Sequence, residues 1–187
     1  FTPHMKHSRP LLIGGGVGIP PMIFLAQSLC EIKGAYQPLV LMGSEVPFPF
    51  TPTPSSIMVP GVPAEVIASM PLLDDLGVPS RLVSQQEMPG CYQGYVTDLT
   101  RVWLEGLDEA DRKEVEIFSC GPHPMLEAVS ALAREFHIPC QVSLEEFMAC
   151  GVGGCAGCVV EVETPQGPAM KRVCVDGPVF DAKSVFP

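Results

Sequence analysis

The sequence predicts an α/β protein in which a parallel sheet with helices on both faces is followed by a small β-rich segment. Strand-like and helix-like stretches alternate from residue 10 to residue 144, and this alternation is typical of a parallel sheet covered on both sides. The chain beyond residue 143 lacks a helical pattern and contains two short strand-like stretches after a cysteine-rich loop. We therefore expect one domain over residues 1–142 and a smaller one over residues 143–187.

The first part of the chain reads as a βαβ unit. Residues 10–13 (PLLI) predict a buried strand, and the glycine run GGGVGIPP follows at once. Residues 21–34 predict a helix, because prolines suit a first turn, where a missing N–H costs nothing, and Gly34 suits the end. Residues 38–42 (PLVLM) predict the second strand and complete the unit.

The middle of the chain opens with a proline-rich segment. Six prolines between Pro47 and Pro63 forbid regular structure and predict an extended surface loop over residues 43–63, of which 45–63 is the proline-rich core. The elements expected beyond it are a helix over 64–76, a strand over 79–84, a helix over 94–107, a charged solvated run over 105–116, a strand over 115–120, a helix over 123–137 and a strand over 139–144.

Two glycine turns follow strands of this predicted sheet. Gly14, Gly15, Gly16 and Gly18 lie between the first strand and the first helix, and SCGPHPM lies between the strongest strand and the strongest helix. In open α/β sheets, ligands bind at the carboxyl ends of strands, where the backbone approaches a pyrophosphate and helix N–H groups point at it. The run is not a clean G-x-G-x-x-G, since Pro21 replaces the third glycine, so a merely tight turn stays open as an alternative.

Single residues near these turns have structural interpretations beside the functional ones. Met125 is interpreted as helix core, His123 as a helix start, and Cys120 equally well as a buried cysteine at a strand end. Glu45 follows the second strand, from which an acid could bond a ribose hydroxyl. A solvated loop acid is the commoner situation at such a position.

Four cysteines near the C-terminus carry the strongest chemical signal. Cys150, Cys155, Cys158 and Cys174 are spaced C-x4-C-x2-C-x15-C, and the first gaps match the plant-type 2Fe–2S pattern. The glycines and alanines between them let the chain wrap closely and turn backbone N–H groups inward, which suits an anionic cluster. The alternatives are a disulfide framework, a structural zinc site and unligated core cysteines. They fit less well, because the thiols crowd one loop, only one Cys-x-x-Cys pair exists, and core cysteines need no glycines.

Composition narrows the classes of partner. The net charge of −10 argues against nucleic acid and anionic membranes, while a hydrophobic content of 47% marks a globular chain. No segment has the uninterrupted apolar length of a membrane helix, and no signal peptide is visible. The other four cysteines are scattered, as in a reducing compartment, so we expect a cytoplasmic protein.

Three motifs together carry a resemblance to a known family. GGGVGIPP, CGPHPM and the run SLEEFMACGVGGCAGCVVEV…KRVCVDGPVF resemble the ferredoxin-reductase-like family and, within it, the electron-transfer subunits of class B dihydroorotate dehydrogenase. The resemblance implies an NAD(P)-binding domain of ferredoxin-reductase type over residues 1–142 and a 2Fe–2S domain over 143–187. It is weak over residues 44–93, where the family usually carries GFRS or similar and this chain reads GSEVPFPF.

The resemblance also implies roles for individual residues. The four cysteines Cys150, Cys155, Cys158 and Cys174 would hold the cluster, and Gly14, Gly15, Gly16 and Gly18 would face the NAD pyrophosphate. Cys120 would be the residue at the reacting nicotinamide, with Gly121 and Pro122 beside it near the flavin. Such subunits begin with a flavin-binding barrel, and neither a barrel sequence nor an Arg-x-Tyr-Ser motif occurs here. We therefore expect FAD to be bound mainly by a segment absent from this chain. We also expect this chain alone to be inactive.

The implied function is to pass electrons from NADH, through FAD and the 2Fe–2S cluster, to a catalytic flavoprotein partner. The partner would be dihydroorotate dehydrogenase, in a heterotetramer that serves pyrimidine biosynthesis. Two alternatives are a related reductase subunit for a hydrogenase, a glutamate synthase or ferredoxin, and a non-catalytic iron–sulfur carrier or sensor. Phe147, Met148 and Val152 in the cysteine loop are expected to face the partner, or else to pack on the chain's own nucleotide domain.

Overall fold

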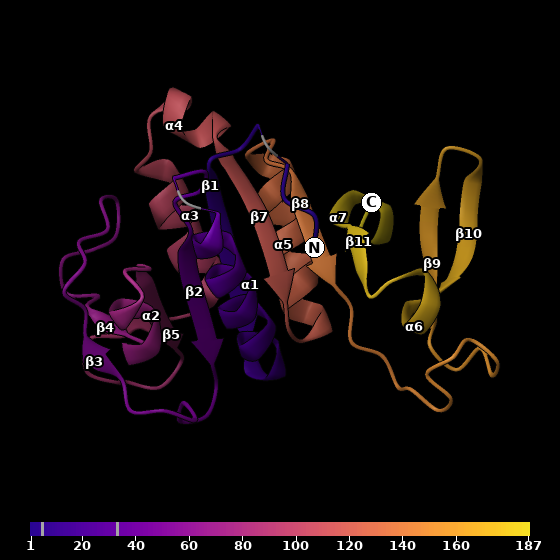
Figure 1. Cartoon of the computed structure of the whole chain (residues 1–187), viewed down its shortest axis with the longest axis horizontal. Coiled ribbons are helices and arrows are strands. Elements are labelled where there is room, and N and C mark those ends of the chain that lie inside the picture. The colour runs from indigo at the N-terminus through magenta and orange to yellow at the C-terminus, as the bar shows by residue number, and fades with distance from the viewer. Residues whose placement is uncertain (5, 33) are drawn as a thin grey trace.

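A seven-stranded, mostly parallel sheet forms the centre of the protein (Figure 1). The computed structural model describes residues 1–4, 6–32 and 34–187, so Lys33, in the first predicted helix, lies outside the described residues. The strand order is β11-β8-β7-β1-β2-β5-β6, and β11 alone runs antiparallel to its neighbour. The strands are β1 (Arg9–Gly15), β2 (Leu39–Ser44), β5 (Ser80–Ser84), β6 (Tyr92–Gln93), β7 (Val115–Cys120), β8 (Cys140–Ser143) and β11 (Val179–Asp181). The predicted fold class is confirmed.

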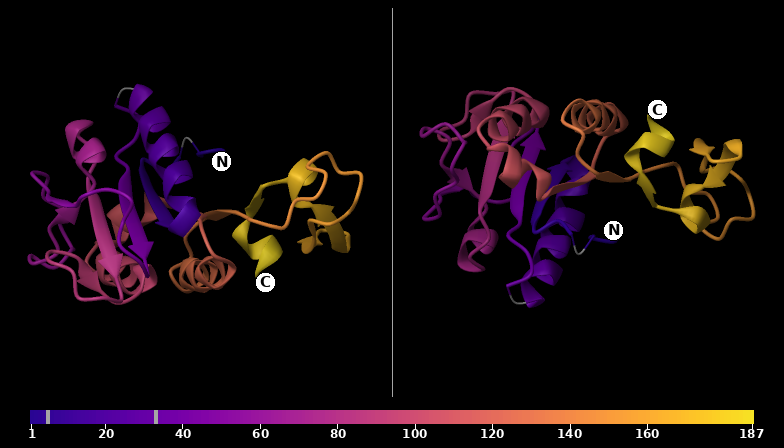
Figure 2. Two further views of the ribbon diagram at one scale, coloured as in Figure 1. Left: turned by 90° about the horizontal axis from the view of Figure 1, so that it is seen from below. Right: turned by 90° about the horizontal axis from the view of Figure 1, so that it is seen from above.

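Helices cover both faces of the sheet. Figure 2 shows α1 (Ile19–Glu31) on one face and α5 (His123–Glu135) on the other, where α3 (Val96–Glu105) packs beside it. Along β7, Ile117 belongs to the apolar core under α3 and α5, while Phe118 belongs to the core under α1. Both faces of the strand are therefore buried, which is why its sequence, like that of β1, is nearly continuously apolar.

The predicted opening βαβ unit is confirmed, with the first strand extending to Gly15 and the helix ending at Glu31. The helix predicted over residues 64–76 is wrong for most of that range. Residues Ala68–Ser69 form β4, which pairs antiparallel with β3 (Thr53–Pro54) inside the proline-rich segment. Only Pro71–Asp75 is helical, as α2. Proline has no backbone N–H, so Pro71 begins the helix and cannot lie inside a longer one.

The charged run over residues 105–116 is solvated only in part. It contains α4 (Glu109–Lys113), which Asp108 caps by accepting a hydrogen bond from the backbone N–H of Asp111 at 2.8 Å. The prediction is wrong for Glu116, which is 1% exposed. Sequence position did not reveal this burial, because what covers Glu116 is the N-terminal segment of the chain.

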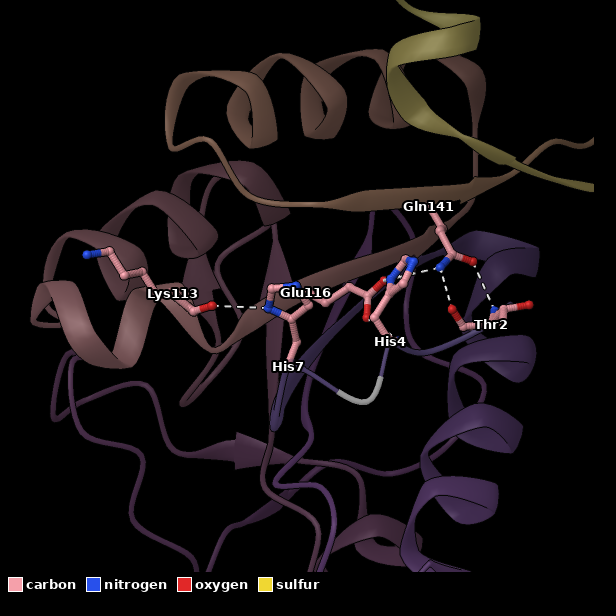
Figure 3. A network of polar contacts seen from close by, with 6 residues as sticks. All are labelled: Thr2, His4, His7, Lys113, Glu116 and Gln141. Atoms are coloured by element: carbon pink, nitrogen blue, oxygen red, sulfur yellow. Dashed lines mark hydrogen bonds and ion pairs between the residues drawn. The ribbon is translucent and has the colours of Figure 1, made fainter.

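The N-terminal segment crosses the α1 side of β7 and β8 and is held there by the buried carboxylate (Figure 3). Glu116 accepts hydrogen bonds from the backbone N–H of His4 at 2.9 Å and from Gln141 Nε2 at 3.1 Å, and its Oε1 lies 2.5 Å from His4 Nδ1. Phe1 packs edge-on against Phe118, with ring centroids 5.6 Å apart. A buried carboxylate needs such partners, so Glu116 fixes where the chain enters the domain.

The C-terminal part contains an antiparallel hairpin of β9 (Val159–Thr164) and β10 (Gly167–Arg172), with two short helices that the sequence did not predict. The strand expected over MKRVCVDG ends at Arg172 and gives way to α6 (Val173–Asp176); α7 (Ala182–Val185) follows β11. One apolar core cluster includes Val142 of the sheet together with Cys158, Val173 and Phe186. The division between residues 142 and 143 stays a prediction. None of the described helices has both the length and the apolar character required to cross a membrane.

Candidate functional site

The two glycine turns meet at the carboxyl edge of the sheet. β1 and β7 are parallel neighbours with Gly14 opposite Cys120, and a 3-10 turn (Gly16–Gly18) leads from β1 into α1. A Cβ atom added at Gly18 would lie 1.9 Å from the carbonyl oxygen of Cys120. The absence of a side chain at Gly18 is thus required by the contact between the two turns.

Met125 covers both turns from the first turn of α5. A Cβ atom at Gly15 would lie 2.5 Å from its Sδ, and one at Gly121 would lie 2.5 Å from its Cε. The sequence interpretation of Met125 as helix core is correct for the part that packs on the core cluster, but the side chain also lines the cavity described next. Only Gly16 of the first turn is open, with φ +54° and nothing within 4 Å of a built Cβ.

A cavity of about 690 Å³ lies at the carboxyl ends of β1, β2 and β5, and its size is in the range of ligand sites. Of the predicted residues, Gly15, Gly16 and Pro122 line it. Gly14, Gly18, Cys120 and Gly121 are not among its lining residues, and they form the layer of backbone behind it. Glu45 is the one charged residue among those that line the cavity in the described part of the chain.

Cys120 is a buried thiol rather than an activated one. It is 9% exposed, and burial raises the pKa of its thiol above the usual value, while a hydrogen bond with Ser143 acts in the opposite direction. The thiol is therefore protonated at neutral pH. Ser143 is its register partner on β8, so the residue that contacts Cys120 is also the last residue before the chain leaves the sheet for the cysteine loop.

The four C-terminal cysteines lie on two segments that the fold brings together. Cys150, Cys155 and Cys158 are on the loop between β8 and β9, and Cys174 is on α6 (Figure 1). Their thiols form two pairs, with Cys150 hydrogen-bonded to Cys155 and Cys158 to Cys174. Cys158 is 4% exposed, whereas Cys150 and Cys155 are exposed.

Backbone N–H groups surround the outer pair of thiols. Cys150 Sγ accepts from the N–H of Val152 at 3.4 Å and of Gly154 at 3.3 Å, and Cys155 Sγ accepts from Gly157 at 3.4 Å. Hydrogen bonds to the Cys150 sulfur, from the backbone of Val152 foremost, then from the backbone and thiol of Cys155 and the backbone of Gly154, lower the pKa of this thiol to about 6. The backbone and thiol of Cys174 lower the pKa of Cys158, and the Cys158 thiol in turn raises that of Cys174.

These residues fit a 2Fe–2S cluster by the chemistry and arrangement of their donors. Four thiols in two pairs suit two tetrahedral irons, and the thiolate is the form that binds metal. Positive φ angles at Gly151 (66°), Gly153 (79°) and Ala156 (56°) turn the loop so that its N–H groups face the sulfurs. In the described part of the chain, no three His, Cys, Asp or Glu side chains are grouped closely enough to hold a single metal ion.

The parallel sheet with two glycine turns at its carboxyl edge, followed by a loop of paired thiols, defines a fold of ferredoxin-reductase type with a C-terminal cysteine-rich part. The solved structure of the NADH-dependent reduced ferredoxin-NADP oxidoreductase superposes on 96% of this chain and 54% of that one, with a TM-score of 0.69 and 24% identity. This likeness shows the fold.

The relatives by sequence are more specific. Residues 145–186 match the family described as the iron–sulfur cluster binding domain of dihydroorotate dehydrogenase B. The electron transfer subunit of dihydroorotate dehydrogenase B (NAD(+)) from Caldanaerobacter subterraneus is 32% identical over 97% of this chain, and that from Listeria monocytogenes is 37% identical over 94%. The chain is a homologue of these subunits and spans 61% and 57% of their lengths.

Sequence reasoning missed two residues of this region. Met125 was not recognised as a cavity residue, because its helical spacing equally fits a core position. Arg172, whose guanidinium donates to the carbonyl of Gly153 at 3.1 Å, gave no signal of its own beyond its place two residues before Cys174.

Proposed function

We propose that this protein acts in electron transfer between a nicotinamide nucleotide and a dihydroorotate-oxidising flavoprotein, as an electron transfer subunit. The observation that carries the proposal is the pairing of Cys150 with Cys155 and of Cys158 with Cys174, with backbone N–H groups directed at the sulfurs. NAD(H), FAD and a 2Fe–2S cluster, when bound, supply hydride and single-electron chemistry. The protein's own contribution is to bind, orient and shield.

The four cysteines would hold the cluster. The lowered pKa of Cys150 leaves its thiol largely ionised at neutral pH, so it is prepared to bind iron without first losing a proton. Cys158, the buried cysteine of the loop, would bind the side of the cluster that faces the protein. Cys174, on α6, would be the fourth ligand. Backbone N–H groups of Val152, Gly154 and Gly157 would then face the negative charge of the cluster.

The cavity at the strand ends would take the nicotinamide nucleotide. Gly16 leaves the backbone open to a pyrophosphate. The N-terminal end of α5, which follows Pro122, adds the partial positive charge of the helix dipole. Cys120 and Gly121 do not line this cavity, so their proposed place beside the nicotinamide and the flavin follows from the family resemblance. Because burial raises its pKa, Cys120 would act there as a neutral thiol.

Glu45 supports a preference for NAD(H) over NADP(H). A carboxylate can accept hydrogen bonds from ribose hydroxyls, whereas it would repel a 2′-phosphate, and no Lys or Arg is among the residues that line the cavity in the described chain. We expect NAD⁺ to bind at least about tenfold more tightly than NADP⁺, which corresponds to about 1.4 kcal/mol. Glu45→Gln should narrow this ratio, and an unchanged ratio in calorimetry would refute the role of the carboxylate.

The partner would dock where the cysteine loop is exposed and apolar. Phe147 is 95% and Val152 80% exposed, and Met148 and Val175 lie on the same part of the chain with large exposed fractions. Exposed apolar groups of this kind mark protein interfaces. We propose a dihydroorotate dehydrogenase flavoprotein as the partner, in a heterotetramer, and a cytoplasmic location, where the unpaired cysteines of this chain would stay reduced.

The proposal is tested first by the metal. Anaerobically purified protein should contain roughly two irons and two sulfides per chain and, when reduced, show the electron-spin signal of a 2Fe–2S centre. Cys155→Ser should abolish or weaken that signal. Cys30→Ser is the matched control, because Cys30 lies on α1, away from the loop. Zinc without sulfide in fresh anaerobic protein would overturn the proposal.

The partner is tested by co-purification of the full-length protein from its native cells. The complex should reduce NAD⁺ in the presence of dihydroorotate. Recovery with a hydrogenase or glutamate-synthase subunit, without dihydroorotate-dependent activity, would reject this partner and favour a related reductase. The 187-residue chain by itself should oxidise NADH poorly, and fast NADH–ferricyanide activity would show that it holds a complete flavin site.

A further inference from the structure

One cationic side chain, on β10, contacts both of the segments that carry the four cysteines, the loop between β8 and β9 and the helix α6. Arg172 is the last residue of β10 and directly precedes α6. Its Nη1 donates to the carbonyl oxygen of Gly153 at 3.1 Å. Its backbone N–H donates to Asp176 Oδ2 at 2.8 Å, and its Nε lies 3.5 Å from the same oxygen. Within the described residues, no other Lys or Arg side chain donates a hydrogen bond to the loop between Cys150 and Cys158.

The conformation of Gly153 and the lack of a side chain there allow this contact. Its φ is +79°, and an added Cβ atom would lie 2.7 Å from Val175 Cγ2 and 3.1 Å from Arg172 Nη1. Its carbonyl therefore faces Arg172, while its N–H donates to the thiol of Cys174. The same residue thus connects the outer loop to the guanidinium on one side and to the fourth cysteine on the other.

Apart from the hydrogen bonds between its N–H groups and its own sulfurs, the outer loop, residues 150–157, makes few contacts. Gly151 and Gly154, which flank this point, have nothing within 4 Å of a built Cβ, and Val152 is 80% exposed. A loop with so few contacts opens easily. The distance from Cys150 and Cys155 to Cys174 therefore depends on the two hydrogen bonds of Gly153, from Arg172 and to the Cys174 thiol, more than on packing.

We propose that Arg172 is a positioning residue for the cluster: it pins Gly153 so that Cys150 and Cys155 stay in place opposite Cys174. The inference rests on the proposed function, because it assumes that these thiols hold a 2Fe–2S centre. A guanidinium is suited to the task because it stays charged at every physiological pH and presents several donors in a fixed plane. Hydrogen bonds from charged donors are also among the stronger ones.

The test compares three variants after anaerobic purification and iron–sulfide reconstitution. Arg172→Gln removes both the positive charge and the planar guanidinium donors, whereas Arg172→Lys keeps the charge on a shorter side chain. Lys171→Gln is the control, one residue away in β10. The readouts are iron and sulfide per chain, the visible circular dichroism and electron-spin signals of the cluster, and the rate of iron release to a chelator.

We expect Arg172→Gln to release iron about tenfold or more faster than the wild type, on the scale of a lost charge-assisted hydrogen bond, with a broadened electron-spin signal. The rate of iron release from Arg172→Lys should lie between those of Arg172→Gln and the wild type, and the rate from Lys171→Gln should match that of the wild type. Should Arg172→Gln not fold, Arg172→Lys still decides the question through its own release rate.

Two results would overturn the inference while leaving the proposed function intact. One is a wild-type release rate and unchanged spectra in both Arg172 variants. The other is a faster release that merely follows a lower unfolding midpoint of the whole chain, with no rescue by lysine, since that would indicate a general structural role. A wild-type protein that takes up no iron–sulfur centre would overturn both.

Discussion

Replacing Gly18 by alanine tests whether the two glycine turns are pressed together as the structure has them. The new Cβ would lie 1.9 Å from the oxygen and 2.2 Å from the carbon of the Cys120 carbonyl, and 2.6 Å from the N of Gly121. All three are backbone atoms at the junction of β1 and β7, so no side-chain rotation relieves the clash. Overpacking costs about 1–3 kcal/mol and occasionally more. We expect a loss at the upper end, of about 3 kcal/mol or more.

Gly16→Ala is the matched control, two residues away in the same turn. A Cβ at Gly16 meets nothing within 4 Å, so only its φ of +54° opposes the substitution. The left-handed conformation costs an L-residue about 1–2 kcal/mol. Gly18 itself has a right-handed conformation with φ −79°. The loss at Gly18 therefore reports the clash between the turns, whereas the loss at Gly16 reports the backbone cost alone.

The assay is urea unfolding followed by the fluorescence of Trp103, the single tryptophan, which is 3% exposed in the core under α3. The free energy of unfolding should fall by at least about 1 kcal/mol more for Gly18→Ala than for Gly16→Ala, given the ranges above. Equal losses in the two variants would refute the packing reason for Gly18. Its lack of a side chain would then need another explanation, such as contact with a ligand.

Three further predictions concern the rest of the domain. The Ser55 and Ser56 side chains hold the pKa of Asp74 below its ordinary value, so this carboxylate stabilises the fold above about pH 4 and loses its contribution as pH falls further. Asp74→Asn should therefore make the free energy of unfolding less dependent on pH below about pH 4, and an unchanged dependence would contradict the role of Asp74. Phe118→Ala, at a fully buried position, should cost about 3–5 kcal/mol in urea unfolding, and a loss below about 1 kcal/mol would show that the site collapses. Burial raises the pKa of Cys140 to about 12, so iodoacetamide at mildly alkaline pH should spare it in the native protein and label it once urea is added; native labelling seen by peptide mass mapping would refute this burial.

The sheet was predictable from the sequence because its strands are buried on both faces. Apolar runs such as residues 38–42 leave no polar face, and their alternation with helix-like stretches favours a parallel sheet. The glycine turn after β1 was predictable for the same local reason, since strand, glycines and helix follow one another directly. These features depend on neighbours within a few residues, which the sequence displays.

Features set by distant contacts could not be read in this way. Glu116 sits in a charged run, yet it is buried by a segment that lies 112 residues away in sequence. β11 returns to the sheet edge beside β8 and runs antiparallel, although the residues between 143 and 178 give no sign of a return. Sequence alone also gave one reason for all four glycines of the first turn, whereas the structure separates Gly16, which is open, from Gly18, which packs on Cys120.

The cysteines likewise combine a feature that is visible in the sequence with contacts that only the fold creates. Their spacing predicted a cluster site, but only the fold shows which thiols lie together and that Cys174 reaches the loop from a helix of a single turn. The role of Gly153, which bonds Arg172 and Cys174 at once, depends on its φ and on residues 19 and 21 positions further on. No local pattern encodes such a contact.

The topology of the sheet also explains why these two sites occur in one small chain. β7 and β8 are parallel neighbours, so their carboxyl ends lie at the same edge, with Cys120 opposite Ser143. One strand ends in the glycine turn behind the cavity, and the other continues into the loop that carries the cysteines. The start of the path between the sites is held at two consecutive residues. Ser143 bonds to Cys120, and the N–H of Leu144 donates to the carbonyl of Pro178 at 2.9 Å. Under the proposed function, this pairing would fix where the cysteine loop begins relative to the nucleotide cavity, and electron transfer between the two sites would depend on their separation.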